Sequence, residues 1–247
     1  HFTQMAFDDY AARRGSVEFY SALSGIETAM WDIVGKATNQ PVYNLLGGPV
    51  REKIRVYANG WYYKMTEPAD YARAAVKCIE MGFTAIKMDP VSGPWRNYLS
   101  RAEERKSVEV LRAVRDAVGP DIDILLDLHR RLSPMHAIRL ADSYEEIEPY
   151  YYEEPCMWEN VEALADIKAS IRLPVVTGEA IYAKTGFRPI LQQNAADIIN
   201  PDVASCGGIL ELKEIAAMAE PYFVAVSPHN YNSTTMALAA TIHASAT

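Results

Sequence analysis

Residues 123–180 read DILLDLHRRLSPMHAIRLADSYEEIEPYYYEEPCMWENVEALADIKASIRLPVVTGEA, and this stretch indicates the fold class. Three apolar runs, at 123–129, 150–155 and 174–180, are separated by two stretches whose apolar residues recur at helical spacing. Such alternation predicts βαβ units with parallel strands. Nearly continuous apolar runs also indicate strands that helices cover on both faces.

The same alternation extends outward in both directions. We expect strands at 53–61, 84–90, 123–129, 150–155, 174–180, 197–204 and 223–230, and helices at 15–36, 68–82, 103–119, 135–147, 160–171, 186–196, 210–220 and 234–245. An open doubly wound sheet is compatible with this order, but no Gly-rich phosphate turn follows the first strand. Unusual polar residues fall at the carboxyl ends of the strands, where barrels keep their active sites. The sequence therefore favours an α/β fold of the TIM-barrel type.

Composition and charge disfavour several classes of partner. The 247 residues include 24 basic and 32 acidic side chains, so the net charge is −8 and neither nucleic acid nor an anionic membrane is an expected partner. No apolar run reaches the roughly 18 residues that a membrane span needs. The three cysteines, Cys78, Cys156 and Cys206, have neither disulfide nor zinc spacing, which predicts a reducing, cytoplasmic location.

Acids occupy three consecutive strand ends. Asp127, Glu153 and Glu179 follow one another at equal intervals of 26 residues, about one βα unit of a barrel. Three carboxylates on one rim repel each other, and a hard dication such as Mg²⁺, or alternatively Mn²⁺, removes that repulsion. The alternative is that each acid caps a helix or pairs with an arginine. Glu154 points to the opposite side from Glu153, and spacing does not say which of the two faces the metal.

The remaining strand ends carry further chemistry. Asp202 and His229 end the next two strands and predict a general-base pair, because an aspartate that accepts the Nδ1 proton orients the ring. His129 shares a face with Asp127 and could bind the metal or protonate a leaving group. Lys87 and Asp89 share a face of the second strand, where the lysine could hold a substrate carboxylate or pair with an acid.

These residues resemble the enolase superfamily, in its mandelate racemase subgroup. The matching segments are ETAMWDIVGKATNQPVYNLLGG, IKMD, LLDLH, YYEEP, TGEA, NPDVASCGG and SPHN, in order over nearly the whole chain. The resemblance implies a (β/α)7β barrel and Mg²⁺ bound by Asp127, Glu153 and Glu179. It also implies a His229–Asp202 base that removes the proton α to a carboxylate, through a metal-stabilised enediolate.

Two details of the resemblance narrow the reaction. Racemases of this subgroup carry Lys-x-Lys on the second strand, and here the second lysine is replaced by Asp89. The Asp-x-His of Asp127 and His129 is instead similar to galactonate-type sugar-acid dehydratases, in which the histidine protonates the departing 3-hydroxyl. The implied product is a 2-keto-3-deoxy acid, with Lys87 and Asp89 near the substrate. The alternatives are a racemase, epimerase or cycloisomerase of the same superfamily, and a non-catalytic barrel that serves in binding.

The resemblance also predicts the domain organisation. Residues 1–50 correspond to the C-terminal part of a capping domain and its linker, and residues 51–247 to a barrel incomplete at its C-terminus. The eighth strand and most of the cap are expected outside this chain, in an enzyme of about 350–400 residues. We expect a small-molecule sugar-acid substrate and a homo-oligomer.

Overall fold

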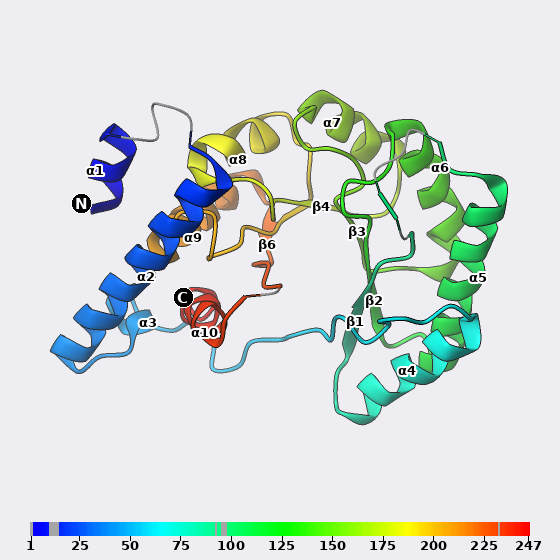
Figure 1. The fold of residues 1–247 in the computed structure, drawn as a ribbon, viewed down its shortest axis with the longest axis horizontal. Helices are drawn as coiled ribbons and strands as arrows, with labels where there is room; N and C mark the ends of the chain where they lie inside the picture. Colours follow the sequence, from blue (N-terminus) through cyan, green and yellow to red (C-terminus); the bar gives the residue numbers. More distant parts are fainter. Residues whose placement is uncertain (1, 10–14, 92, 95–97, 232) are drawn as a thin grey trace. The chain divides into compact units, whose positions relative to one another are not determined.

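The computed structural model describes residues 2–9, 15–91, 93–94, 98–231 and 233–247 (Figure 1). The chain divides into two compact units. Unit 1 comprises His1–Ile54, Gly178–Gln192 and Ile198–Thr247, and unit 2 comprises Arg55–Thr177 and Gln193–Asp197. Each unit is therefore assembled from segments that are far apart in the sequence.

Unit 2 contains, among its described residues, a parallel sheet of four strands. The strands β1 (Ala85–Met88), β2 (Asp123–Asp127), β3 (Tyr151–Glu153) and β4 (Val175–Thr177) pair in chain order. The intervening helices are α4 (Pro68–Glu80), α5 (Arg101–Val118), α6 (Pro134–Tyr144), the 3-10 helix η2 (Glu145–Ile147) and α7 (Val161–Ser170). Every residue of β1, β3 and β4 is buried, as expected for strands covered on both faces.

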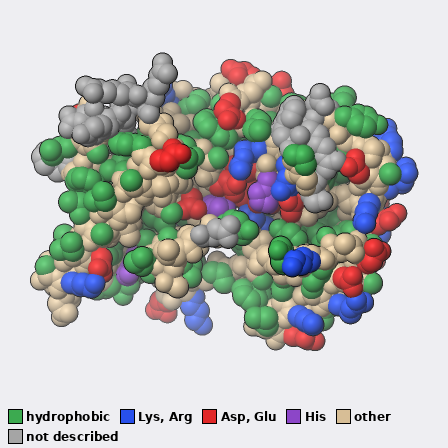
Figure 2. Space-filling view, in the orientation of Figure 1, with side chains coloured by type: hydrophobic (Ala, Val, Ile, Leu, Met, Phe, Trp, Pro, Cys, Tyr) green, Lys and Arg blue, Asp and Glu red, His purple; other side chains and the backbone are tan. Residues whose placement is uncertain are grey.

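Helix α5 illustrates how sequence signals set the elements of unit 2. Ser100 accepts a hydrogen bond from the backbone of Glu103, and Glu103 accepts one from the backbone of Ser100, which forms a capping box. Gly119 ends the helix at φ 82°. Over α4 and α5, acidic and basic side chains are interspersed (Figure 2). The solvent-facing side of these helices is thus a mixed-charge surface.

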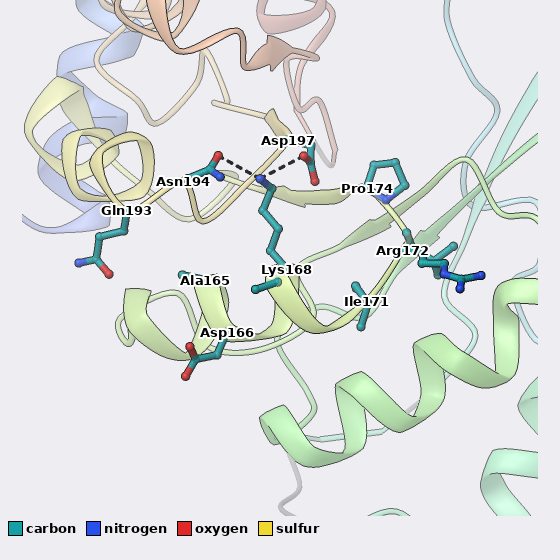
Figure 3. Close-up of a pocket in the computed structure, with 11 residues that line it drawn as sticks. Ala165, Asp166, Lys168, Ile171, Arg172, Pro174, Gln193, Asn194 and Asp197 are labelled. Carbon is teal, nitrogen blue, oxygen red and sulfur yellow. Dashed lines mark hydrogen bonds and ion pairs between the residues drawn. The ribbon is translucent and has the colours of Figure 1, made fainter.

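Segment 193–197 is held in unit 2 by Lys168 of α7. Lys168 Nζ donates to Asn194 Oδ1 at 3.0 Å and lies 3.2 Å from Asp197 Oδ1 (Figure 3). Asp197 Oδ2 accepts a hydrogen bond from Val175 N at 2.9 Å. Lys168, Asn194 and Asp197 line a cavity of about 470 Å³. They connect α7 to the amino end of β4.

Unit 1 is mainly helical in the part of the chain that the structure describes. Its helices are α1 (Phe2–Asp9), α2 (Val17–Thr38), α3 (Val42–Leu45), α8 (Ala183–Gln192), α9 (Ile209–Ala219), the 3-10 helix η3 (Glu220–Tyr222) and α10 (Thr235–Ser245). Two short strands, β5 (Ile198–Ile199) and β6 (Ala225–Val226), pair in parallel. No described helix is both long enough and apolar enough to cross a membrane.

Helix α2 buries a partly polar face. Ser16 caps its start, and Asn39 ends it in the left-handed conformation at φ 53°. Three apolar residues that recur at helical spacing, Ile26, Met30 and Ile33, are exposed, and Figure 2 shows hydrophobic side chains over this helix. The buried face instead includes Ser24 and Glu27. Periodicity thus located the helix but not the face it buries.

The expected strand at 53–61 is wrong over most of its length. Only Ala58 forms a bridge, with Ile86 of β1; Ala58 N donates to Ala85 O at 3.0 Å and Lys87 N donates to Ala58 O at 2.8 Å. Arg55 and Val56 are exposed, and Gly60 turns the chain at φ 75°. Pairing stops here because a strand needs a run of ladder hydrogen bonds and the turn ends that run. The other six expected strands are present in shorter form.

Candidate active site

A buried lysine joins two of the predicted acids in unit 2. Asp127 and Glu153 are register partners at the ends of β2 and β3. Lys87 Nζ lies 3.0 Å from Asp127 Oδ2 and 2.7 Å from Glu153 Oε1, and the side chains of all three residues are at most 2% exposed. Burial lowers the pKa of Lys87, but Glu153 and Asp127 outweigh it and the pKa lies well above its usual value. Carboxylate oxygens from two strands therefore already converge on a cation here.

The structure separates Glu153 from Glu154. Glu153 accepts hydrogen bonds from Lys87 on both carboxylate oxygens. The side chain of Glu154 accepts a hydrogen bond from Thr177 Oγ1 at 3.1 Å and lies 3.4 Å from Arg130. Alternation along β3 thus puts Glu153 beside Asp127 and directs Glu154 elsewhere.

His129 follows β2 in a left-handed turn. Its φ is 46° and that of Arg130 is 61°. His129 Nδ1 lies 3.2 Å from Asp89 Oδ2, and its Nε2 lies 3.4 Å from Asp127 Oδ2. Burial lowers the pKa of His129, but the hydrogen bond with Asp89 and the charges of Asp127 and Asp89 outweigh it, so the pKa is raised. The two predicted residues His129 and Asp89 are therefore in contact.

The predicted substrate-binding pair, Lys87 and Asp89, is engaged with protein groups. Lys87 forms the ion pair with Asp127 that the sequence left open as an alternative, together with one to Glu153. Asp89 Oδ1 accepts a hydrogen bond from Val91 N at 3.0 Å, and Asp89 Oδ2 accepts one from Arg131. Arg131 was not predicted; its only signal is its place two residues after His129.

Unit 1 brings together three of the predicted residues. His229 Nδ1 lies 2.7 Å from Asp202 Oδ2, and His229 Nε2 lies 3.0 Å from Glu179 Oε2. Backbone pairing sets this geometry, because Asp202 and His229 form a parallel bridge and His229 N donates to Pro201 O at 3.1 Å. Gly178, at φ 145°, precedes Glu179; a Cβ there would lie 2.8 Å from Phe187 and 3.0 Å from Asn200 N. The turn into Glu179 thus requires glycine.

The loop after Asp202 is anchored by residues whose roles sequence reasoning missed. Glu27 of α2 accepts hydrogen bonds from Ile209 N at 2.8 Å and Leu210 N at 3.0 Å, the first turn of α9. Ser24 Oγ accepts one from Gly207 N at 3.0 Å. A Cβ at Gly208 would collide with the Glu27 carboxylate. Glu27 belongs to the segment ETAMWD, which the resemblance includes. That segment does not indicate which backbone groups Glu27 would bind.

Two further described histidines and the three cysteines lie outside these groups. His136 is buried and accepts a hydrogen bond from Leu99 N at 3.1 Å, and His243 Nδ1 accepts one from Tyr43 N. All three cysteines are free and buried, consistent with packing roles.

Comparison with known families accounts for most of the chain. Residues 70–247 match the family described as "Enolase C-terminal domain-like", and residues 5–47 match "Mandelate racemase / muconate lactonizing enzyme, N-terminal domain". The first match confirms the predicted α/β class and barrel type. The predicted domain division at residue 50 stays a prediction.

Individual relatives agree with this assignment. The chain is 38% identical over 218 residues to the D-gluconate/D-galactonate dehydratase of Picrophilus torridus. The aligned region covers 87% of this chain and 55% of that protein. It is 36% identical to the D-gluconate dehydratase of Thermoproteus tenax, covering 87% of the chain and 43% of that protein. The chain thus spans about half the length of these curated relatives.

Solved structures give the same result. An enolase-superfamily member from Salmonella Typhimurium matches with a TM-score of 0.93 and 34% identity, over 99% of this chain and 67% of that one. A mandelate racemase/muconate lactonizing enzyme from Sulfitobacter sp. matches with a TM-score of 0.93 and 36% identity, over 99% and 64%. The chain therefore belongs to the mandelate racemase/muconate lactonizing enzyme family of the enolase superfamily.

Proposed function

We propose that the protein carrying this chain is a sugar-acid dehydratase. The observation that carries the proposal is the contact of His129 with Asp89, because Asp89 occupies the position at which a two-base racemase of this family would need a lysine. A carboxylate there serves the histidine and does not act as an opposing base. The names of the relatives, which are gluconate, galactonate and xylonate dehydratases, support the same reaction class.

Asp127, Glu153 and Glu179 are proposed to hold a divalent cation, Mg²⁺ or Mn²⁺. The residues fit such an ion: two of the carboxylates are buried and converge on one lysine nitrogen, and all three offer the hard oxygen donors that Mg²⁺ prefers. When bound, the ion would neutralise the negative charge that develops on the substrate carboxylate.

His229 is proposed to remove the proton from C2 of the acid. Its Nδ1 contact with Asp202 leaves Nε2 as the nitrogen that receives the proton. Asp202 stabilises the resulting imidazolium and fixes the ring orientation. The aspartate is itself held, since its Oδ1 accepts a hydrogen bond from Ala204 N at 2.8 Å.

His129 is proposed to protonate the departing C3 hydroxyl. The C3–O bond breaks as the C2 electron pair forms a C2–C3 double bond, and the hydroxyl leaves as water with the His129 proton. The enol then tautomerises to a 2-keto-3-deoxy acid. A contact of Lys87 with the substrate carboxylate stays a prediction, and it requires Lys87 to share its ammonium with Asp127 and Glu153.

The direct test is a panel of aldonic and aldaric acids incubated with the purified protein and Mg²⁺. We expect at least one acid to give a 2-keto-3-deoxy product, detected by a keto-acid assay and mass spectrometry. Exchange of the C2 proton in D₂O with retention of the 3-hydroxyl for every acid would instead indicate an epimerase or racemase. The absence of both reactions would favour a non-catalytic barrel.

A further inference from the structure

Asp89 in unit 2 binds protein groups through both of its carboxylate oxygens. Both of its oxygens are occupied: Oδ1 by Val91 N at 3.0 Å, and Oδ2 by Arg131 Nη1. Arg131 Nη1 also donates to Val91 O at 2.9 Å. The carboxylate and the guanidinium are thus locked to the same short segment after β1, and the Asp89 side chain is only 10% exposed.

The left-handed turn after β2 brings Arg131 to this carboxylate. Residues 129 and 130 both have positive φ without being glycine, a conformation that costs about 1–2 kcal/mol per residue. Backbone hydrogen bonds hold it: His129 N donates to Asp127 Oδ1 at 2.9 Å, and Arg130 N donates to Glu154 O at 2.7 Å. Such strain persists only where the surroundings impose it, and here it lets His129 and Arg131 approach one aspartate.

Asp89 offers the nearer acceptor for a hydrogen on the Nδ1 of His129. Asp89 Oδ2 accepts hydrogen bonds and lies 3.2 Å from Nδ1, whereas Arg131 is a donor that lies 3.4 Å from the same nitrogen. Nδ1–H is therefore directed at Asp89, and the proton given to substrate is the one on Nε2 of the protonated ring, the nitrogen that lies 3.4 Å from Asp127 Oδ2.

We propose that Arg131 and Asp89 are positioning residues for His129: Arg131 fixes Asp89, and Asp89 fixes the ring and tautomer of the histidine. This inference rests on the proposed function, since it gives His129 its role in loss of the 3-hydroxyl. Neither Arg131 nor Asp89 needs to touch the substrate. Misplacing a proton donor by about 1 Å can cost about 10²-fold in rate.

The test compares Arg131→Met, Arg131→Lys and Asp89→Asn in the Mg²⁺-loaded protein. We expect Arg131→Met and Asp89→Asn to lower keto-acid formation by about 10–10²-fold while C2 exchange in D₂O changes by less than about threefold. Arg131→Lys should recover part of the loss, because an ammonium still pairs with Asp89. Arg139→Lys is the matched control: Arg139 pairs with Glu104 in the same unit without contacting His129, so it should leave the ratio of the two reactions unchanged.

A second readout is independent of turnover. Nitrogen-15 NMR of the neutral His129 ring, the form left when Nε2 has given up its proton, is assigned with His129→Asn. It should show the Nδ1–H tautomer in the native protein and a mixture in Asp89→Asn and Arg131→Met. An Nε2–H tautomer, or one unchanged in Asp89→Asn, would overturn the inference. An equal loss of exchange and elimination in Arg131→Met would also overturn it, by indicating a general structural role. If no acid yields a keto acid, the proposed function fails, and the NMR result still decides the positioning role.

Discussion

His129 and His229 lie in different units but have similar immediate surroundings. Each Nδ1 faces an aspartate oxygen, at 3.2 Å from Asp89 in unit 2 and at 2.7 Å from Asp202 in unit 1. Each Nε2 faces an acid at a strand end, at 3.4 Å from Asp127 and at 3.0 Å from Glu179. The immediate partners of the rings therefore do not distinguish a base from an acid.

The two histidines differ in the groups that bind their partner aspartates. Asp89 is bound by the Arg131 guanidinium, whereas the second oxygen of Asp202 accepts a hydrogen bond from the neutral backbone N of Ala204. A carboxylate paired with arginine attracts a proton on its histidine less strongly than one bound by a neutral group. This difference is consistent with the roles proposed above, in which His129 delivers a proton and His229 removes one.

Replacement of His229 is expected to have the largest effect, because it removes the group that starts the reaction. His229→Asn should lower both C2 exchange and keto-acid formation by about 10²–10⁴-fold, the usual contribution of a general base. Both rates can be followed in one D₂O incubation by mass spectrometry. His243→Asn, on α10, is the control and should leave both rates unchanged. C2 exchange at the native rate in His229→Asn would show that another group is the base.

Replacement of His129 should lower keto-acid formation without an equal loss of C2 exchange. His129→Asn removes the proton donor for the leaving hydroxyl, so we expect keto-acid formation to fall by about 10²–10⁴-fold. C2 exchange should persist within a few-fold of native, since His229 and Asp202 are intact. The measurement is the ratio of deuterium incorporation to keto acid. Loss of both rates together would refute a separate acid role and make the two histidines a single functional group.

Removal of Lys87 tests the carboxylate pair in unit 2. Lys87→Met leaves Asp127 and Glu153 buried without their cation, which should lower the free energy of unfolding by about 3–5 kcal/mol. Mg²⁺ should restore part of this stability and EDTA should remove the recovery, because a dication can replace the ammonium between the carboxylates. Urea unfolding with each addition measures the effect.

The matched control for Lys87 is Lys168→Met. Its partner Asp197 is 41% exposed, so we expect a loss of about 0–1 kcal/mol and no response to Mg²⁺. An equal response to Mg²⁺ in the two variants would argue against a metal site at Asp127 and Glu153.

Regular features of the sequence predicted the βα order and the strand-end acids. The interval between Asp127 and Glu153 indicated residues at one height, and the structure pairs them in register where β2 and β3 both end. The strand expected at 53–61 was wrong because its letters resemble a strand while only Ala58 has a pairing partner. Local pattern does not reveal whether a neighbouring strand is available.

Two other contacts between distant segments could not be predicted. Arg131 meets Asp89 only because two residues adopt positive φ, and nothing in the letters HRR requires that conformation. Glu27 was part of a recognised motif, but its partners, the backbone N–H groups at Ile209 and Leu210, carry no side-chain signal. Backbone donors are the same for every residue, so sequence does not mark them.

The smallest expected effect is on the His229 side, where Glu27 anchors the loop after Asp202. Glu27→Gln keeps one acceptor for the first turn of α9 and should lower the free energy of unfolding by about 1–2 kcal/mol near pH 5. Burial raises the pKa of Glu27 above its ordinary 4.5, and the hydrogen bonds from Leu210, Ile209 and Trp31 only partly offset it.

A raised folded pKa means that this group's contribution is greatest below pH 4.5 and declines as pH rises through the folded pKa. The stability advantage of the native protein over Glu27→Gln should therefore shrink as pH rises above about 4.5, as measured by urea unfolding. Glu18, on the same helix, is the control: its hydrogen bond with Ser16 lowers the pKa, so Glu18→Gln should show the opposite slope, with its contribution lost as pH falls. An advantage over Glu27→Gln that grows with pH would mean that the charged carboxylate is favoured at the α9 terminus. Glu27 would then hold the loop after Asp202 through its charge, as Arg131 holds Asp89 through an ion pair.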